Sequence, residues 1–228
     1  DETFAVNVDA AQRLVEQPEV APVRVVFMVH PNSPTGNALT ATELAWLEQL
    51  PPDVLVVIDE AYFEFSQQTK VAAVLSRSNW VVLRTFSKAF RLAAYRVGYA
   101  VANPALIQAL EKVRLPYNLP SLTQMAAQLA LAHRHELLAA IPEIQQQRQA
   151  LATAIAQHTP LTLWPSAANF LYGRPPLPPG QSLETELQRW FQQLRAQGTL
   201  IRHTGGGLRI TVGTLEENER TLAHLNQI

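Results

Sequence analysis

Residues 80–90 read WVVLRTFSKAF, and this stretch decides the fold. Its first four residues form a short apolar run that is typical of a buried strand. Ser87 and Lys88 therefore fall in the loop at the carboxyl end of that strand. Open α/β sheets bind their ligands at this end of their strands, so the stretch predicts both a sheet and a site.

The amine of Lys88 is the reactive group in this loop. Lys88 stands between Phe86 and Phe90, so we expect its amine to be kept away from water. Desolvation lowers the proton affinity of a lysine amine, and the neutral amine can attack a carbonyl to form a Schiff base. Ser87 and Arg96 can bind a phosphate nearby. This combination indicates pyridoxal phosphate, whereas a solvated loop lysine is the simpler alternative.

Apolar runs on either side of this stretch predict the rest of the sheet. Further buried strands are expected at residues 23–29, 54–58 and 97–101. Thr40 and Glu43 stand in capping-box register before one helix, and Asn103 followed by Pro104 opens another. Near-continuous apolar strands that alternate with helices predict an α/β fold with a largely parallel sheet covered by helices.

The pattern changes in the second half of the chain. A helical pattern over residues 121–158 contains Pro142, which we expect to kink or break it. Short strands are predicted at residues 161–164, 170–172, 200–202 and 208–212, around a helix at residues 182–197. We therefore predict a large α/β domain over residues 1–135, incomplete at its N-terminus. A small α+β domain over residues 136–228 follows, reached through a long helix.

The composition narrows the function classes. The 228 residues carry a net charge of −1 and no basic run longer than a pair, which does not favour nucleic acid or an anionic membrane as a partner. The absence of cysteine excludes disulfides and thiolate metal sites and suits a cytoplasmic protein. The six histidines show no helical metal-binding spacing. Because the first residues resemble neither a start methionine nor a signal peptide, we expect a part of a longer protein.

Asp59 and Tyr62 follow the apolar run at residues 54–58. A strand-end aspartate is most often a helix cap or part of an ion pair. In a pyridoxal phosphate site it pairs instead with the protonated pyridine nitrogen, which keeps the ring an electron sink. Tyr62 then bonds the ring hydroxyl, or else it is an ordinary half-buried tyrosine.

Residues 30–37 read HPNSPTGN and follow another predicted strand. The rigid turn and its polar side chains make this a candidate ring-contact loop, although most such stretches are simply turns. Arg209 lies in an alternating strand, where the periodicity alone favours an outward arginine, and Arg202 carries the same alternative. Residues 205–207 are glycines that precede a strand rather than a helix, so we predict a flexible hairpin turn and not a phosphate loop.

Together these segments resemble fold-type I pyridoxal-phosphate aminotransferases, most closely their histidinol-phosphate aminotransferase branch. The matching motifs are HPNSPTG at 30–36, VIDEAY at 57–62, RTFSKAF at 84–90, RVGY at 96–99 and LRITVG at 208–213. Their order and spacing match over the whole chain, which corresponds to the C-terminal two-thirds of that family.

The resemblance implies a role for each cofactor residue. Lys88 forms the Schiff base with pyridoxal phosphate and later moves the proton between the substrate Cα and the cofactor. Ser87 and Arg96 bind the cofactor phosphate, Asp59 the pyridine nitrogen and Tyr62 the ring oxygen.

The resemblance also implies the substrate residues and the reaction. Arg209 meets the carboxylate next to the reacting amine, Arg202 helps to hold the substrate phosphate, and Asn169 lies in a segment close to the site. The implied reaction transfers an amino group between glutamate or 2-oxoglutarate and histidinol phosphate or imidazole-acetol phosphate, in histidine biosynthesis, by a homodimer with a shared active site. The alternatives are an aromatic-amino-acid aminotransferase or a phospho-amino-acid decarboxylase of the same fold, and a non-enzymatic sensor that binds the cofactor.

The chain departs from the family pattern in three places. The family usually has asparagine directly before Pro-Thr-Gly, where this chain has Ser33 preceded by Asn32, so either residue remains a candidate for the cofactor contact. Arg91 and Ala94 replace glycines that are common after the lysine. The N-terminal part of the family, which supplies a phosphate-loop segment and a tyrosine for the partner's site, lies outside the sequence.

Overall fold

The computed structural model describes residues 3–17 and 21–228. They form two compact units. Unit 1 comprises Asp1–Pro31 and Ala38–Ala139, and unit 2 comprises Asn32–Asn37 and Ala140–Ile228. The two domains predicted from the sequence stay a prediction, because compact units are not by themselves independently folding domains.

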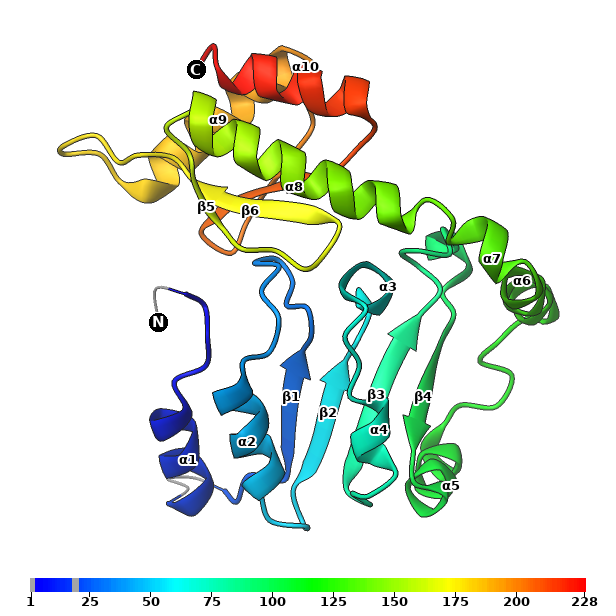
Figure 1. Ribbon diagram of the computed structural model, residues 1–228. Coiled ribbons are helices and arrows are strands. Elements are labelled where there is room, and N and C mark those ends of the chain that lie inside the picture. The colour runs from blue at the N-terminus through cyan, green and yellow to red at the C-terminus, as the bar shows by residue number, and fades with distance from the viewer. Residues whose placement is uncertain (1–2, 18–20) are drawn as a thin grey trace. The chain divides into compact units, whose positions relative to one another are not determined.

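Unit 1 is built on a four-stranded sheet with the order β1-β2-β3-β4. Its strands are β1 (Val25–Val29), β2 (Leu55–Asp59), β3 (Trp80–Thr85) and β4 (Gly98–Ala102). The first three run parallel and β4 runs antiparallel to β3. The arrowheads of β1, β2 and β3 therefore meet at one edge of this sheet (Figure 1). The predicted α/β class with a largely parallel sheet is confirmed, and β4 is its antiparallel exception.

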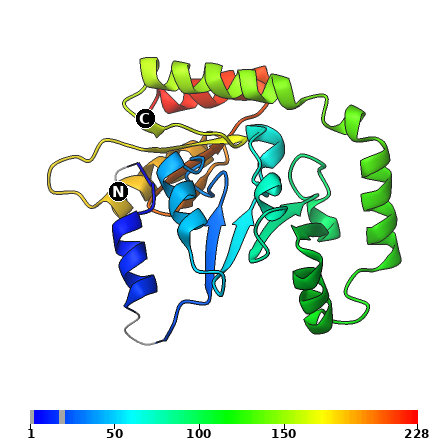
Figure 2. The same cartoon turned by 60° about the horizontal axis from the view of Figure 1, so that its bottom comes forward.

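The helices of unit 1 begin where the sequence supplies caps. They are α1 (Val8–Glu16), α2 (Ala41–Gln49), α3 (Phe63–Ser66), α4 (Val71–Val74), the 3-10 turn η1 (Ala93–Tyr95), α5 (Pro104–Val113), α6 (Ser121–Ala132) and α7 (Arg134–Leu137). The predicted capping box is present, since Thr40 Oγ1 accepts the Glu43 N–H at 3.2 Å and Glu43 Oε2 accepts the Thr40 N–H at 2.7 Å. Figures 1 and 2 both place α1 beside α2 on the β1 side of the sheet, and α5 and α6 on the β4 side.

The two central strands of the unit 1 sheet, β2 and β3, are buried on both faces, as their continuous apolar runs predict, whereas Phe27 of β1 is 68% exposed. Val56 and Ile58 pack with Trp46 of α2 in one cluster. Val57 and Val81 point to the opposite face, because side chains alternate along a strand, and each is 4% exposed. Polar side chains of these central strands are thus confined to the strand ends.

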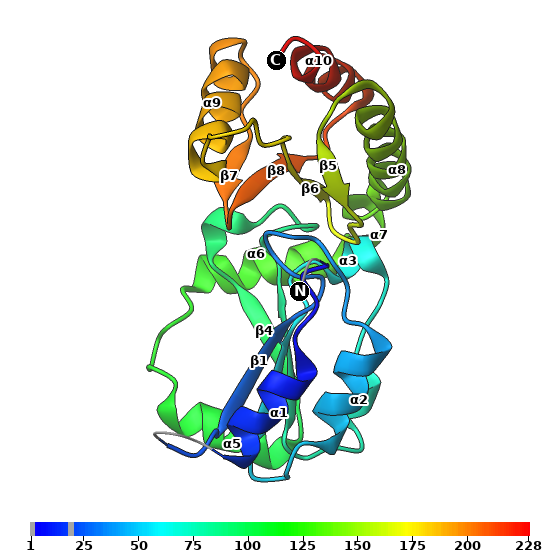
Figure 3. The same cartoon turned by 90° about the vertical axis from the view of Figure 1, so that its left-hand side faces the viewer.

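Unit 2 contains an antiparallel sheet with the order β5-β6-β8-β7. Its elements are α8 (Ile141–His158), β5 (Thr162–Trp164), β6 (Phe170–Arg174), α9 (Leu183–Ala196), β7 (Arg202–Thr204), β8 (Gly207–Thr211) and α10 (Leu215–Leu225). Helices α8 and α10 lie side by side (Figure 3). Leu171 and Ile210 of the sheet pack with Leu151, Leu187 and Trp190 of the helices in one core.

Two sequence expectations are refined in this unit. Pro142 lies in the first turn of α8, where its missing N–H leaves no helical bond unmade, so the long helical pattern is broken before α8 and not kinked within it. Gly205 and Gly206 form the two-residue turn between β7 and β8, with φ of +60° and +72°. Such turns need positive φ at both positions, and the predicted hairpin turn is confirmed. Across residues 3–17 and 21–228, no helix has the length and apolar content needed to cross a membrane.

Candidate active site

The carboxyl ends of β2 and β3 bring two of the predicted site segments to one edge of the unit 1 sheet. Asp59 is the last residue of β2 and lies opposite Leu83 of the parallel strand β3. Strand β3 ends two residues later at Thr85, and Ser87 and Lys88 follow in the loop. The parallel register therefore places Asp59 and the Lys88 loop as neighbours along that edge.

Lys88 is exposed, and its Nζ lies 5.3 Å from the ring centroid of Tyr62. Phe86 and Phe90 are 4% and 6% exposed and pack on each other in a core cluster, with ring centroids 5.0 Å apart. The expectation that these two rings keep the amine from water is therefore wrong for this chain. Residues 86–90 form bends and a turn and not a strand, so Lys88 does not have to share the buried side of Phe86 and Phe90.

Asp59 and Tyr62 are joined by a short turn. The Ala61 N–H donates to Asp59 Oδ1 at 2.9 Å, so the carboxylate stabilises the turn after β2 through one of its oxygens. Asp59 itself is half-buried, whereas Tyr62 is 5% exposed and directly precedes α3. Asp59 is therefore not a helix cap, since α3 begins after Tyr62 without a side-chain cap, and the described residues show no hydrogen bond to its Oδ2.

Ser87 and Arg96 stand at either end of the segment that connects β3 to β4. The Ser87 N–H donates to Thr85 Oγ1 at 3.0 Å, and the two hydroxyls lie 2.9 Å apart. Arg96 is exposed, adopts φ of +52° after η1 and donates from Nη1 to the Ala93 carbonyl at 2.9 Å. In the described part of the chain the two side chains make no contact with each other, and both remain accessible to an anion.

A buried ion pair at the same edge escaped the sequence analysis. The carboxylate of Glu60 and the guanidinium of Arg84 are 2.9 Å apart, and their side chains are 0% and 14% exposed. Glu60 follows Asp59 directly, and Arg84 precedes Lys88 by four residues. Opposite charges within two of the quoted motifs are a signal in the sequence, but only the strand register shows that they meet.

His30, at the end of β1, is a second group that sequence reasoning missed. Its side chain is fully buried, and Nδ1 accepts the Leu39 N–H at 3.0 Å. Nε2 is buried without a hydrogen-bond partner among the described residues. Burial lowers the pKa of His30, and Lys70 lowers it further, against smaller opposite contributions from Glu60 and Glu43. The imidazole is therefore neutral and carries its proton on Nε2.

The substrate candidates of unit 2 lie on neighbouring strands. Arg202 of β7 stands directly opposite Arg209 of β8, so both side chains point to the same face of the sheet. Arg209 lies over the Phe170 ring at 4.8 Å, and its Nη1 donates to Ser33 Oγ at 3.3 Å. Arg209 Nε is buried with no hydrogen-bond partner in the described residues. Leu208 and Ile210 pack in the core of unit 2, so Arg209 points to the other face of the strand, as the periodicity predicts, and is partly exposed. Arg202 is exposed.

Asn32 and Asn169 make contacts of a different kind. Asn32 Nδ2 donates to Thr35 Oγ1 at 2.6 Å, which holds its amide inside the turn. Asn169 is half-buried, and its carbonyl accepts the Val212 N–H at 3.0 Å. Of the two residues that compete for the ring contact, Ser33 is the exposed one and the one bonded to Arg209.

The predicted site residues are thus divided between the two units. Unit 1 holds Asp59, Tyr62, Ser87, Lys88 and Arg96, and unit 2 holds Asn32, Ser33, Asn169, Arg202 and Arg209. Within unit 1 the structure brings Lys88 to Tyr62, and within unit 2 it brings Arg209 to Ser33 and Arg202.

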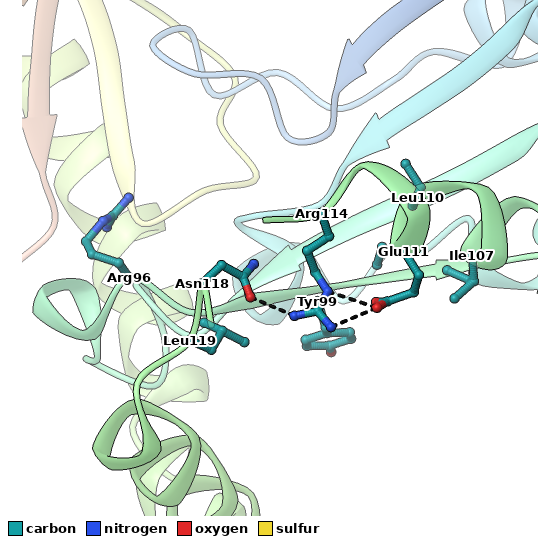
Figure 4. Close-up of a pocket in the computed structure, with 10 residues that line it drawn as sticks. Arg96, Tyr99, Ile107, Leu110, Glu111, Arg114, Asn118 and Leu119 are labelled. Atoms are coloured by element: carbon teal, nitrogen blue, oxygen red, sulfur yellow. Dashed lines mark hydrogen bonds and ion pairs between the residues drawn. The ribbon is translucent and has the colours of Figure 1, made fainter. Parts of the chain in front are cut away.

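A cavity of about 690 Å³ lies beside β4 in unit 1 and is lined by β4, α5 and the segment that follows α5. Arg114 donates there to Glu111 at 2.9 Å and to Asn118 at 2.7 Å, while Arg96 extends away from that cluster (Figure 4). Of the predicted site residues, the described lining contains Arg96 alone. Its described lining does not include Lys88 or Asp59, the amine and the carboxylate that we assign to the cofactor. Within the described residues, no group of His, Asp and Glu side chains is placed to hold a metal ion.

Comparison with known sequences gives a consistent result. The sequence profile of the family described as "Aminotransferase class I and II" matches residues 1–225. The histidinol-phosphate aminotransferase of Trichodesmium erythraeum is 52% identical over 233 residues, which cover all of this chain and 62% of that protein. Histidinol-phosphate aminotransferase 2 of Nostoc sp. is 54% identical over 98% of this chain and 58% of its own length. The chain thus spans about three-fifths of the length of the curated relatives it matches.

Solved structures show the same similarity. The histidinol-phosphate aminotransferase of Sinorhizobium meliloti, in complex with pyridoxal-5'-phosphate, is 27% identical and superposes with a TM-score of 0.77 over 90% of this chain and 56% of its own. The histidinol-phosphate aminotransferase of Clostridium acetobutylicum covers all of this chain and 69% of its own, with a TM-score of 0.85. Since the latter is 19% identical, it supports the fold alone.

Proposed function

Since the chain belongs to the family of class I and II aminotransferases, we propose that it is the larger part of a pyridoxal-phosphate-dependent histidinol-phosphate transaminase. The enzyme exchanges an amino group between histidinol phosphate or imidazole-acetol phosphate and glutamate or 2-oxoglutarate, in histidine biosynthesis. The names of relatives that are 52% and 54% identical over nearly the whole chain support this substrate pair.

The arginine pair of unit 2 is the observation that carries the substrate assignment. Like charges directly opposite each other on neighbouring strands repel, so Arg202 and Arg209 weaken the sheet unless anions lie between or above them. A buried donor without a partner, such as Arg209 Nε, has the same cost. The phosphate of histidinol phosphate, or in the other half-reaction the carboxylates of glutamate, would supply anions that offset both costs.

The groups of unit 1 fit the cofactor. Lys88 is accessible for covalent attachment, Asp59 Oδ2 is available to a protonated ring nitrogen, and Arg96 is accessible to a phosphate. Tyr62, whose ring centroid lies 5.3 Å from Lys88 Nζ, is our candidate for the contact with a ring oxygen. These are the donor and acceptor types that pyridoxal phosphate requires, in neighbouring positions along one sheet edge.

Bound pyridoxal phosphate supplies a protonated ring that withdraws electrons from the substrate Cα. Asp59 keeps the proton on that ring by its negative charge. Lys88 would hold the cofactor covalently and, once its amine is free, would move the Cα proton as general base and acid. Ser87 and Arg96 anchor the phosphate end, so that the reacting bond stays in reach of Lys88.

The proposal includes a homodimer with a shared active site and a cytoplasmic location. The absence of cysteine over 228 residues supports the location, because thiol-free chains have no need of an oxidising compartment. Analytical ultracentrifugation tests the dimer directly, and a monomer at working concentration contradicts it.

The decisive experiment is reduction with borohydride in the presence of pyridoxal phosphate, followed by peptide mapping. We expect a visible absorption band before reduction and the label on Lys88 after it. Label on other lysines in a folded, full-length protein contradicts the proposal. Amino transfer from glutamate then separates the enzyme from a sensor that only binds the cofactor, and the absence of carbon dioxide release separates it from a decarboxylase.

Substrate identity is tested through Arg202. We expect Arg202→Ala to damage turnover of histidinol phosphate far more than turnover of a phosphate-free aromatic amino acid. Arg195, an exposed arginine of α9, provides the matched control as Arg195→Ala. Equal loss on both substrates contradicts the phosphorylated substrate and favours the aromatic aminotransferase.

A further inference from the structure

We propose that Glu60 and Arg84 are positioning residues for the cofactor site, and that their buried ion pair clamps the Asp59–Tyr62 turn against the strand that leads to Lys88. The inference deepens the proposed function and rests on it. Neither residue is placed to touch cofactor or substrate, so both act through the residues that do.

Glu60 is fixed from two sides. Its N–H donates to the Leu83 carbonyl at 2.8 Å and so continues the ladder between β2 and β3 by one residue. Its fully buried carboxylate accepts hydrogen bonds from the Arg84 guanidinium at 2.9 and 3.0 Å, from the Thr69 hydroxyl at 2.9 Å and from the Lys70 N–H at 2.5 Å. Four donors on one carboxylate leave it a single orientation.

Arg84 holds the other side of the same turn. Its guanidinium carbon lies 3.5 Å from the centroid of the Phe63 ring, a close cation–π contact. Arg84 Nη2 also donates to Thr69 Oγ1 at 2.8 Å. The Arg84 guanidinium therefore contacts both Glu60 and Phe63, the residues that directly precede Ala61 and directly follow Tyr62.

The clamp acts on both reactive groups at this edge. Arg84 belongs to β3, and the chain runs from it through Thr85, whose hydroxyl accepts the Ser87 N–H, into Lys88. Asp59 and Tyr62 lie on the opposite side of the ion pair. The distance between the ring-nitrogen partner and the attaching amine is thereby set through a rigid, planar fork and not through flexible side chains.

Stability alone is a weak reason for such a pair. Removing two charges from water costs about as much as their attraction returns, and apolar replacements of a buried pair are often neutral or stabilising. A planar arginine fork does, however, fix direction as well as distance. The geometry therefore points to preorganisation of the site as the gain that offsets the desolvation cost.

The test uses the full chain in three variants. Glu60→Gln removes the charge of the acceptor, and Arg84→Lys keeps the positive charge but loses the fork and the stacking on Phe63. Arg24→Gln is the matched control, because Arg24 pairs with Asp53 at the amino edge of the same sheet. Three quantities are measured: amide hydrogen exchange of cofactor-free protein, the pH midpoint of the visible absorption of bound pyridoxal phosphate, and kcat with KM.

For both clamp variants we expect faster exchange confined to peptides over residues 59–66 and 84–90, and a displaced pH midpoint. We expect kcat to fall on the order of 10²-fold, the loss that a misplacement of about 1 Å produces. KM for the substrates should change little, because Arg202 and Arg209 are intact. Arg24→Gln should match the parent in all three quantities.

Other outcomes of these measurements would contradict the positioning role of Glu60 and Arg84. Exchange that rises evenly over β1 to β4 assigns the pair to global stability and overturns the inference, as does an unchanged exchange pattern and midpoint. If Glu60→Gln does not fold, Arg84→Lys carries the same test. If the parent chain takes no label at Lys88, the proposed function fails, while local exchange still decides whether the clamp orders this turn.

Discussion

The two edges of the unit 1 sheet carry the same kind of ion pair in opposite surroundings. At the amino edge, Arg24 and Asp53 pair with side chains that are 62% and 64% exposed. At the carboxyl edge, the Glu60 and Arg84 side chains are 0% and 14% exposed. Solvated ion pairs contribute little to folding stability. Buried charges, by contrast, destabilise the fold unless each has its partner and hydrogen bonds. Of these two ion pairs, the one with the costly burial is the one at the edge where the candidate site lies.

The largest expected effect lies at the exposed tip of the carboxyl edge. Because Lys88 supplies both covalent attachment and proton transfer, Lys88→Ala should lower transamination at least about 10³-fold, within the range of about 10²–10⁴ that one positioned acid–base group contributes. Its side chain is exposed, so the midpoint of urea unfolding should not move. Initial rates with glutamate and equilibrium unfolding measure the two. Activity within tenfold of the parent would remove Lys88 from the mechanism.

The next effect compares the two ion pairs directly. Glu60→Ala leaves the Arg84 charge buried without its partner, which typically costs about 3–5 kcal/mol of unfolding free energy. Asp53→Ala at the amino edge should cost at most about 1 kcal/mol, because water screens that pair. Urea unfolding of both variants, at equal ionic strength, gives the difference. Equal losses would show that burial does not distinguish the two edges.

A smaller loss of folding stability is expected from a substitution in β4, where this strand pairs with β3, the strand that contains Arg84. A Cβ at Gly98 would lie 2.5 Å from the carbonyl oxygen of Arg84, and because the nearest atoms are all backbone of β3, no flexible side chain can move aside. Gly98→Ala should therefore cost about 1–3 kcal/mol through overpacking. Ala100→Ser, two residues along the same strand, serves as the control. Thermal unfolding that shifts equally in both variants would contradict a specific close approach.

Much of the fold follows from local pattern alone. The apolar runs give β1, β2 and β3, and the cap residues Thr40 and Asn103 give the starts of α2 and α5. The prediction that failed, shielding of Lys88 by Phe86 and Phe90, depended on which side of the loop faces the core. The rings of Phe86 and Phe90 are buried, but they do not shield Lys88, because neighbours in sequence point to different sides of a loop.

The site divides in the same way. Strand-end positions selected Asp59 and Lys88, the family resemblance assigned Arg209, and the roles of all three stay predictions. The Glu60–Arg84 pair could not be predicted, because nothing local fixes the register between two parallel strands whose connection contains α3 and α4. His30 was missed for a related reason. Its partner, Leu39, lies nine residues away on the far side of the loop that carries Ser33.

The last expected effect is the pH dependence contributed by His30 at the carboxyl edge. Burial lowers the pKa of His30 in the folded chain, whereas the unfolded chain binds a proton near the ordinary value of about 6.5. The unfolded state therefore holds more protons as the pH falls below about 6.5, and stability decreases there until the folded-state pKa is reached. One such proton contributes a slope of at most about 1.4 kcal/mol per pH unit.

His30→Asn tests this assignment, because an asparagine oxygen can still accept the Leu39 N–H but cannot be protonated in that range. We expect urea unfolding between pH 7 and pH 5 to show a shallower loss of stability in this variant than in the parent. His135→Asn, at an exposed position, should leave the slope unchanged. If His30→Asn and His135→Asn change the slope equally, the buried imidazole does not titrate differently from a solvated one. The polar burial at the carboxyl edge would then end at Glu60 and Arg84 and would not extend to β1.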